Sequence, residues 1–89
     1  MYFVYILQSE KDNQLYVGMT SNVERRLKQH NDGGVRSTSK RRPFKVIYKE
    51  PYSSRVEARE REKFLKSYKG AKEKLEIVER ASRALSSIG

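Results

Sequence analysis

The fold is decided by residues 2–19, YFVYILQSEKDNQLYVGM, in which two apolar runs flank a polar turn. Tyr2 to Gln8 is aromatic, aliphatic or β-branched at almost every position, which predicts a strand covered on both faces. Glu10 to Asn13 is polar and predicts a turn, and Leu15 to Met19 predicts a second, shorter strand. The two strands are therefore expected to form an antiparallel hairpin with a loop of about four or five residues.

The middle of the chain predicts one more helix and one more strand, joined by a loop. Ser21 or Asn22 is a suitable N-cap, and Gly33-Gly34 is a suitable helix end. The expected segments are a helix from Val23 to His30, a basic loop from Val35 to Pro43, and a third strand from Phe44 to Lys49 in the same sheet.

The last part of the chain predicts two helices. Ser54 and Glu57 match a capping box and open a helix that is expected to run to about Lys69. Its expected apolar arc consists of Ala58, Phe64, Leu65 and Tyr68. Arg61 falls inside that arc, so its stem is expected to pack while its head reaches a phosphate or solvent. A third helix is expected over residues 71–85, with an apolar stripe on Leu75, Val78, Ala81 and Leu85.

This order, β-β-α-β-α-α, predicts an α+β fold in which helices flank a small three-stranded antiparallel sheet. The length of 89 residues favours a single domain over residues 1–89, with a core from about 2 to 69.

Composition narrows the classes of partner and of site. The chain has 20 Lys and Arg against 11 Asp and Glu, for a net charge of +9, which favours nucleic acid first and an anionic membrane surface second. It has no Cys, which excludes disulfides, thiolate metal sites and cysteine nucleophiles, and it has one His. Any metal site must therefore use carboxylate oxygens, which suit Mg²⁺ or Mn²⁺. No membrane span is expected, and without a leader pattern the protein is expected to be cytoplasmic.

Five polar residues fit one reaction when they are taken together: Tyr5, Tyr16, Arg26, His30 and Glu62. Each alone has an ordinary structural explanation, such as core packing of the tyrosines or pairing of Glu62 with Lys66. Phosphodiester cleavage needs an activated water and stabilisation of charge on the phosphoryl oxygens. A carboxylate can anchor a divalent cation, an arginine can bind the phosphate, and a tyrosine or histidine can deprotonate water.

The same residues carry a resemblance to a known family. Phe3-Val4-Tyr5 followed by Tyr16-Val17-Gly18 resembles the paired signature of the GIY-YIG nuclease superfamily, with Phe3 in place of the first Gly. The run from Thr20 to Asn31 resembles the helix that carries an Arg and a His, and the run from Glu57 to Lys66 resembles the helix with the metal-binding Glu. The resemblance points to the small stand-alone bacterial members, which are similar to the N-terminal nuclease domain of the excision-repair incision subunit.

The resemblance implies a role for each matched residue. Tyr5 and Tyr16 would be the two active-site tyrosines, and whether Tyr5, Tyr16 or His30 acts as general base stays open. Arg26 would bind the scissile phosphate, and Glu62 would hold a single Mg²⁺ or Mn²⁺ ion. Gly18 would let the backbone approach closely.

The expected function is that of a metal-dependent endonuclease that hydrolyses DNA by structure rather than by sequence, with DNA repair or recombination as its setting. The expected phosphate contacts are Arg25, Arg36, Lys40, Arg41, Arg42 and Lys45. The alternative is a non-catalytic nucleic-acid-binding module with the same fold, and RNA stays open as a partner. A third possibility is a small assembly domain whose charge serves solubility. The sequence also leaves open a homodimer or a protein partner.

Overall fold

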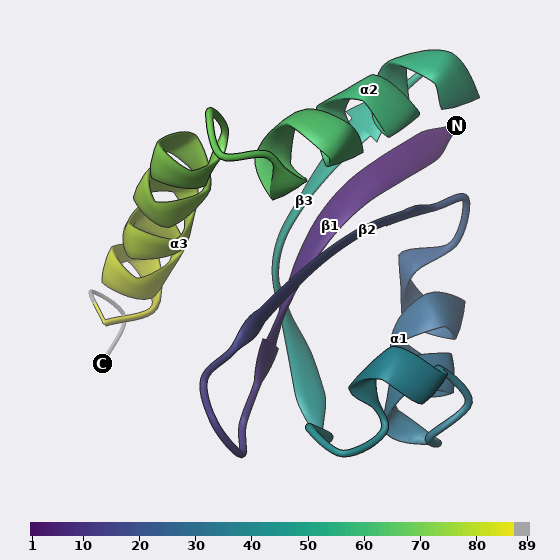
Figure 1. Cartoon of the computed structure of the whole chain (residues 1–89), viewed down its shortest axis with the longest axis vertical. Coiled ribbons are helices and arrows are strands. Elements are labelled where there is room, and N and C mark those ends of the chain that lie inside the picture. Colours follow the sequence, from purple (N-terminus) through teal and green to yellow (C-terminus); the bar gives the residue numbers. More distant parts are fainter. Residues whose placement is uncertain (87–89) are drawn as a thin grey trace.

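The computed structural model describes residues 1–86, and the side chains of residues 1–81. Three strands and three α-helices follow the predicted order (Figure 1). Their bounds are β1 Tyr2–Ser9, β2 Leu15–Thr20, α1 Val23–Asn31, β3 Phe44–Tyr52, α2 Arg55–Lys66 and α3 Ala71–Ser86, with a short 3₁₀ turn, η1, at Arg36–Thr38. The α+β class predicted from the sequence is confirmed.

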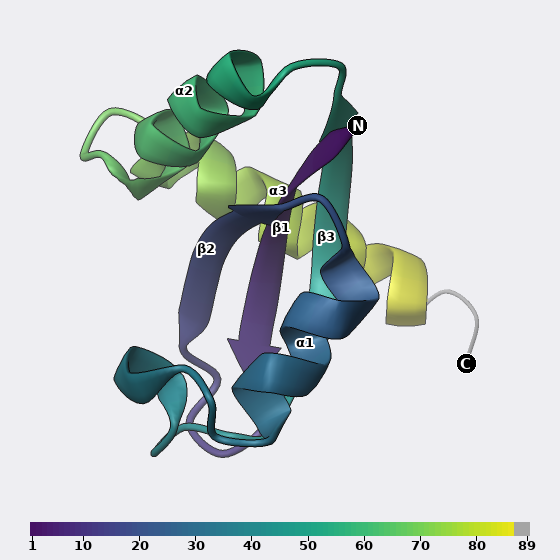
Figure 2. The ribbon, with the colours of Figure 1, turned by 90° about the vertical axis from the view of Figure 1, so that its right-hand side faces the viewer.

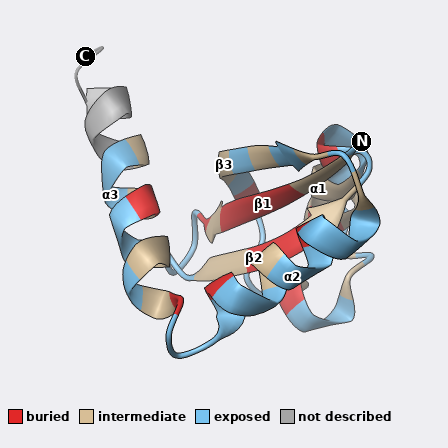
Figure 3. Cartoon of the chain, turned by 90° about the horizontal axis from the view of Figure 1, so that it is seen from above, coloured by how far each residue is buried: buried red, intermediate tan, exposed pale blue. Residues whose placement is uncertain are grey.

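The three strands form one antiparallel sheet in the order β2-β1-β3, so β1 lies in the centre. Helix α1 covers one face, whereas α2 and α3 lie on the other (Figure 2). Four consecutive residues of β1, Val4 to Leu7, are at most 1% exposed, as expected of a central strand covered on both sides. Figure 3 shows these buried positions along β1 and the exposed outer surfaces of the helices.

Each face of the sheet has its own apolar cluster. Val4 and Ile6 of β1 pack with Ala58 and Leu65 of α2 and with Ile77 of α3. On the opposite face, Tyr5 and Leu7 pack with Val23 and Phe44, and Tyr16 and Leu27 lie against them. The alternation of β1 therefore separates a structural face, which holds α2 and α3, from a face that carries polar aromatic residues.

Side-chain caps start α1 and α2 as predicted. Asn22 Oδ1 accepts a hydrogen bond from the Arg25 backbone N–H at 3.0 Å, and Ser54 Oγ accepts one from Glu57 N–H at 3.2 Å. Helix α2 ends at Lys66, so the predicted end at Lys69 is wrong. The reason is local: Ser67 is extended, and its hydroxyl donates to the carbonyl of Phe64 at 2.6 Å.

The early end of α2 changes which apolar residues are buried. Phe64 and Tyr68 were predicted to pack, but they are 39% and 98% exposed, because Tyr68 lies in the turn after the helix. In α3, Leu75 is also exposed, and Ile77 takes the buried position instead. Val78 packs partly against the core as predicted. The predicted contribution of Leu85 lies outside the described side chains.

The head group of Arg61 pairs with two carboxylates of the protein, whereas the sequence predicted that it reaches a phosphate or solvent. Its Nε lies 2.6 Å from Glu50 Oε1, and its two Nη atoms lie 3.0 and 2.9 Å from the carboxylate oxygens of Glu73. The hydroxyls of Tyr48 and Tyr52 also donate to Glu50. Arg61 of α2 thereby joins β3 to α3.

Candidate active site

Strand pairing places the two candidate tyrosines on the α1 face of the sheet. Tyr5 of β1 lies opposite Gly18 of β2, and Tyr16 lies two residues before that glycine. A Cβ at position 18 would lie 2.5 Å from the Tyr5 hydroxyl oxygen, so no side chain fits there. Gly18 therefore makes room for the ring of Tyr5, which crosses over β2 with its hydroxyl toward the β2 edge.

His30 is fully buried and contacts both tyrosines. Its ring centroid lies 4.8 Å from that of Tyr16 and 6.3 Å from that of Tyr5. The Nε2 atom lies 3.4 Å from the Tyr5 hydroxyl, and the Nδ1 atom lies 2.8 Å from the hydroxyl of Thr38 in η1. The end of α1 and the η1 turn thus hold the imidazole from two directions.

The contacts of Thr38 favour the tautomer of His30 that carries its proton on Nδ1. The Thr38 hydroxyl donates its proton to the carbonyl of Val35 at 3.3 Å, so it accepts the hydrogen bond from His30 Nδ1–H. Burial, with the nearby charge of Arg26, lowers the pKa of His30 to about 4, so the ring is neutral at pH 7. Nε2 is then a free lone pair that faces the Tyr5 hydroxyl.

Arg26 faces the tyrosines from the same helix as His30. The Tyr5 hydroxyl raises the pKa of Arg26, and the Tyr16 hydroxyl adds to this effect. In return, Arg26 partly offsets the rise that burial causes in the pKa of Tyr5. The net pKa of Tyr5 is above its ordinary value of 10.0, so the hydroxyl keeps its proton at neutral pH.

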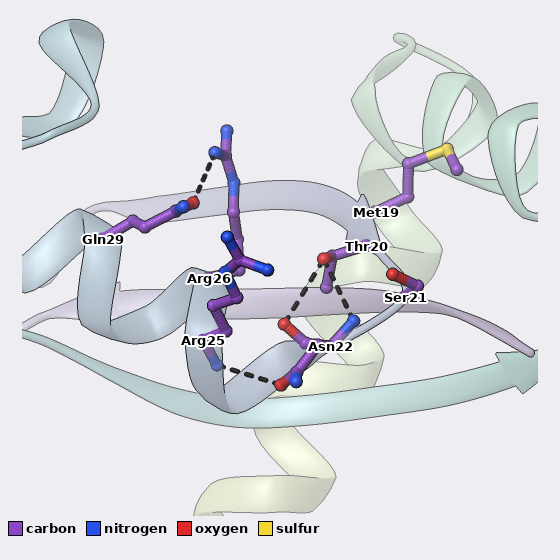
Figure 4. Close-up of a pocket in the computed structure, with 7 residues that line it drawn as sticks. All are labelled: Met19, Thr20, Ser21, Asn22, Arg25, Arg26 and Gln29. Atoms are coloured by element: carbon purple, nitrogen blue, oxygen red, sulfur yellow. Dashed lines mark hydrogen bonds between the residues drawn. The ribbon is translucent and has the colours of Figure 1, made fainter.

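Next to these groups lies a polar hollow, which we call the α1 hollow. It has a volume of about 280 Å³ and is lined by Met19, Thr20, Ser21, Asn22, Arg25, Arg26 and Gln29. Figure 4 shows both arginines reaching into it, with Arg26 Nη1 held 3.0 Å from Gln29 Oε1. Two guanidinium groups in a small polar concavity form a site that suits a phosphate.

Glu62 approaches from α2, on the other face of the sheet. Its side chain is 15% exposed, and its charge contributes to the raised pKa of Tyr5. Lys66 Nζ lies 3.2 Å from Glu62 Oε2 and 5.6 Å from the centre of the Tyr16 ring. The ordinary alternative for Glu62, a pair with Lys66, is therefore present in the structure, and the lysine also lies over the ring of Tyr16.

The side chains near Glu62 limit how a metal ion could be bound there. Among the side chains that the structure describes, no cluster of three His, Asp or Glu residues could hold an ion. A single carboxylate nevertheless fits Mg²⁺, which usually keeps several waters and takes phosphate oxygens as its other ligands. The candidate site therefore fits a metal that binds together with a phosphate.

The other predicted nucleic-acid contacts lie outside this cluster. Arg36, Lys40, Arg41, Arg42 and Lys45 are exposed, and they lie in or next to the segment that carries Thr38. Arg41 is 3.8 Å from Asp12, and the guanidinium of Arg42 lies over Gly33. The structure thus brings together Tyr5, Tyr16, Arg26 and His30, while these five exposed cations lie outside that cluster.

Comparison with known proteins identifies the family. The family described as the GIY-YIG catalytic domain matches residues 1–76 of the chain. The chain belongs to this family. The resemblance noted from the sequence is confirmed, and the family is one of nucleases, whose substrates are nucleic acids.

Small bacterial relatives match most of this GIY-YIG chain. A UPF0213 protein of Staphylococcus haemolyticus is 43% identical over 79 residues, which cover 88% of this chain and 94% of the relative. The UPF0213 protein YazA of Bacillus subtilis is 38% identical over 80 residues, covering 89% and 80%. The solution NMR structure of a UPF0213 protein from Bacillus halodurans is 32% identical, has a TM-score of 0.52 and covers 86% of this chain and 85% of the other. No helix formed by residues 1–86 is long and apolar enough to cross a membrane.

Two residues of the GIY-YIG site were not predicted from the sequence. Thr38 lies in a Ser-Thr-Ser run eight positions after His30, and nothing in that run indicates a contact with the imidazole. Lys66 was expected only as an ion-pair partner of Glu62, and its position over Tyr16 depends on how α2 crosses β2.

Proposed function

We propose that this chain is a metal-dependent endonuclease that hydrolyses DNA phosphodiester bonds by the shape of its substrate. The observation that carries the proposal is the hydrogen-bond chain from Tyr5 through His30 to Thr38, with Arg26 beside the tyrosine hydroxyl. A binding module needs positive charge, but it does not need a neutral, oriented imidazole next to a phenol and a guanidinium.

The chain of hydrogen bonds supports a specific route for the proton of the attacking water. Water gives a proton to the Tyr5 oxygen while Tyr5 passes its own proton to His30 Nε2, which becomes an imidazolium. The hydroxide oxygen bonds to phosphorus, the bond from phosphorus to the leaving oxygen breaks, and that oxygen takes a proton from solvent. Burial is the main cause of the low pKa of His30, and a phosphate bound at Arg26 would offset the smaller effect of the arginine charge, which favours this transfer.

Arg26 and Arg25 would bind the phosphate in the α1 hollow, where Gln29 holds the Arg26 head group. A Mg²⁺ or Mn²⁺ ion at Glu62 would supply positive charge at the leaving oxygen. The exposed cations Arg36, Lys40, Arg41, Arg42 and Lys45 would contact the flanking backbone, so binding is expected to fall steeply with salt. DNA repair or recombination in the cytoplasm is the proposed setting.

One observation favours the alternative of a non-catalytic nucleic-acid-binding module. Lys66 already neutralises Glu62 at 3.2 Å, so a metal must displace an ammonium group to reach the carboxylate. If that displacement fails, the arginines and the basic segment still bind a phosphate backbone, of DNA or of RNA.

A cleavage assay separates the two functions. Supercoiled plasmid, single strands, flaps and four-way junctions would be incubated with Mg²⁺, Mn²⁺ or EDTA. Glu62→Ala would be purified beside Glu60→Ala, a matched control at an exposed position of the same helix. Metal-dependent cutting that only Glu62→Ala abolishes supports the nuclease, whereas DNA binding by all three proteins without cutting supports the binding module.

A further inference from the structure

The turn between α2 and α3 holds an aromatic side chain almost entirely in solvent. Tyr68 is 98% exposed, more than any other large apolar side chain that the structure describes. Its side chain has no hydrogen bond or ring contact with any residue that the structure describes. A tyrosine ring has a large apolar surface that normally packs against the protein, so the exposure of Tyr68 needs a structural explanation.

The cause lies in the backbone of the turn. The Ser67 hydroxyl donates to the Phe64 carbonyl at 2.6 Å and accepts from the Gly70 N–H at 3.2 Å. Gly70 lies so close to Phe64 that a Cβ would be 1.8 Å from the Phe64 carbonyl oxygen. These contacts hold the turn in one tight conformation and direct the intervening Tyr68 away from the core. The tight conformation of the turn therefore keeps the ring of Tyr68 exposed to solvent.

Four exposed lysines lie in the same segment as Tyr68, and one of them, Lys66, pairs with Glu62 at 3.2 Å. From position 63 to 72 every third residue is a lysine, and the segment contains no Asp or Glu; the four are Lys63, Lys66, Lys69 and Lys72. All four are exposed. Lys66 lies over the ring of Tyr16, so this surface begins at the candidate active site.

The surface and the basic segment lie near the same edge of the sheet, although α2 and α3 pack on the face opposite α1. The α2–α3 turn and the segment with η1 both lie on the β2 side of the sheet, at opposite ends of it (Figure 2). Tyr16 of β2 connects the two segments through side-chain contacts, because its ring contacts both Lys66 and His30. A strand that leaves the active site along α2 would reach Tyr68.

We propose that the turn, defined by Lys63 to Lys72, binds single-stranded nucleic acid, with Tyr68 stacked on an unpaired base and the lysines on adjacent phosphates. An aromatic ring among cations is the arrangement that binds single strands, because every base has a face on which to stack. In a duplex that face is covered by the neighbouring base pair, so only the lysines would engage. The proposal rests on the proposed function, since it names the unpaired strand as the part of the substrate held beside the scissile phosphate.

A tryptophan reporter tests the stacking directly. The chain contains no Trp, so Tyr68→Trp introduces a single fluorophore at the proposed contact. It would be titrated in EDTA with a pyrimidine single strand, with the matched duplex and with a strand of abasic sites. We expect strong quenching by the pyrimidine strand alone. Val56→Trp, at an exposed position near the other end of α2, is the control and should not respond.

Affinity measurements with side-chain variants complete the test. Tyr68→Ala should weaken single-strand binding by about tenfold, while Tyr68→Phe keeps the ring and should stay within about twofold. Thermal unfolding should be unchanged, because the residue is exposed. Equal quenching by duplex or by abasic strand, an equal response from Val56→Trp, a response to polyglutamate, or unaltered binding by Tyr68→Ala would each overturn the proposal.

The outcome is independent of catalysis because EDTA prevents any metal-dependent step. Quenching without cleavage in the Glu62 assay would leave the stacking site standing and reject the nuclease. Cleavage without quenching would reject the stacking site and leave the nuclease standing.

Discussion

The hydroxyl of Thr38 lies 2.8 Å from Nδ1 of His30, on the opposite side of the ring from Nε2, which lies 3.4 Å from the Tyr5 hydroxyl; this arrangement favours the tautomer with its proton on Nδ1. Thr38, in a short 3₁₀ turn, thereby favours Nε2 as the hydrogen-bond acceptor of the buried imidazole. Such partners orient a histidine for proton transfer even though they do not touch the substrate.

Thr38→Val should therefore lower kcat for DNA cleavage by about tenfold or more, with a much smaller change in KM. The methyl group keeps the shape of the side chain and removes the acceptor. Because the chain has a single His, ¹⁵N NMR of the ring reports this residue alone. We expect the Nδ1–H tautomer in the wild type and a mixture in the variant, with Thr38→Ser restoring both tautomer and rate. An unchanged tautomer in Thr38→Val would contradict the assignment.

Protonation of His30 should make folding sensitive to mild acid. Its pKa is about 4 in the folded protein and 6.5 when unperturbed, so between these values the unfolded chain binds the extra proton. The contribution of neutral His30 to the free energy of unfolding is fully present above pH 6.5. It decreases as the pH falls toward 4, by up to about 1.4 kcal/mol per pH unit. Urea denaturation from pH 7.5 to 4.5 checks this. His30→Gln should flatten the slope, and an equal slope in that variant would assign it to another group.

Gly18→Ala should displace the Tyr5 ring, because the new methyl group would lie 2.5 Å from its hydroxyl oxygen. We expect a loss of about 1–3 kcal/mol in the free energy of unfolding, together with loss of cleavage. Gly34→Ala is the control, since its Cβ would meet only the Gln29 carbonyl oxygen, at 3.3 Å. Denaturant melts and the plasmid assay measure both effects. A Gly18→Ala variant as stable as the wild type would show that Tyr5 does not need the space.

Arg61→Met should destabilise the fold without removing a residue of the candidate site. It leaves the carboxylate of Glu50, which is 16% exposed, without its cationic partner, and it releases Glu73 of α3. We expect a loss of about 2–3 kcal/mol in the free energy of unfolding. Arg59→Met changes an exposed arginine on the same helix and should have little effect. Similar losses in both variants would argue against a specific role for the bridge.

Replacing Arg41 and Arg42 together by Ala should weaken binding to all DNA sequences alike, since both side chains are exposed in the basic segment. The slope of log affinity against log salt should fall by up to about two. Arg55 and Arg59 of α2, replaced together, provide a control of equal charge change. Fluorescence anisotropy over several sequences and salt concentrations measures the effect. A loss confined to one sequence would contradict backbone contact.

Local patterns predicted most of the fold. The two apolar runs of Tyr2 to Met19 and the polar turn between them indicated the hairpin. The caps at Asn22 and Ser54 indicated where α1 and α2 begin, because these signals depend on neighbouring residues. The end of α2 was misplaced because the extended conformation of Ser67 is stabilised by contacts of Phe64 and Gly70 that periodicity does not register. The burial of Tyr68 was mispredicted for the same reason.

By itself, the sequence determined the strand and helix order, the excess of positive charge and the set of residues that mark the GIY-YIG family. Only the tertiary structure decided that Thr38 holds His30, that the Tyr5 ring fills the space over Gly18 and that Arg61 bridges Glu50 to Glu73. Each of these relationships joins residues at least eight positions apart. Spacing along the chain encodes contacts within one helix or strand, whereas contacts between elements depend on the angle and register at which those elements pack.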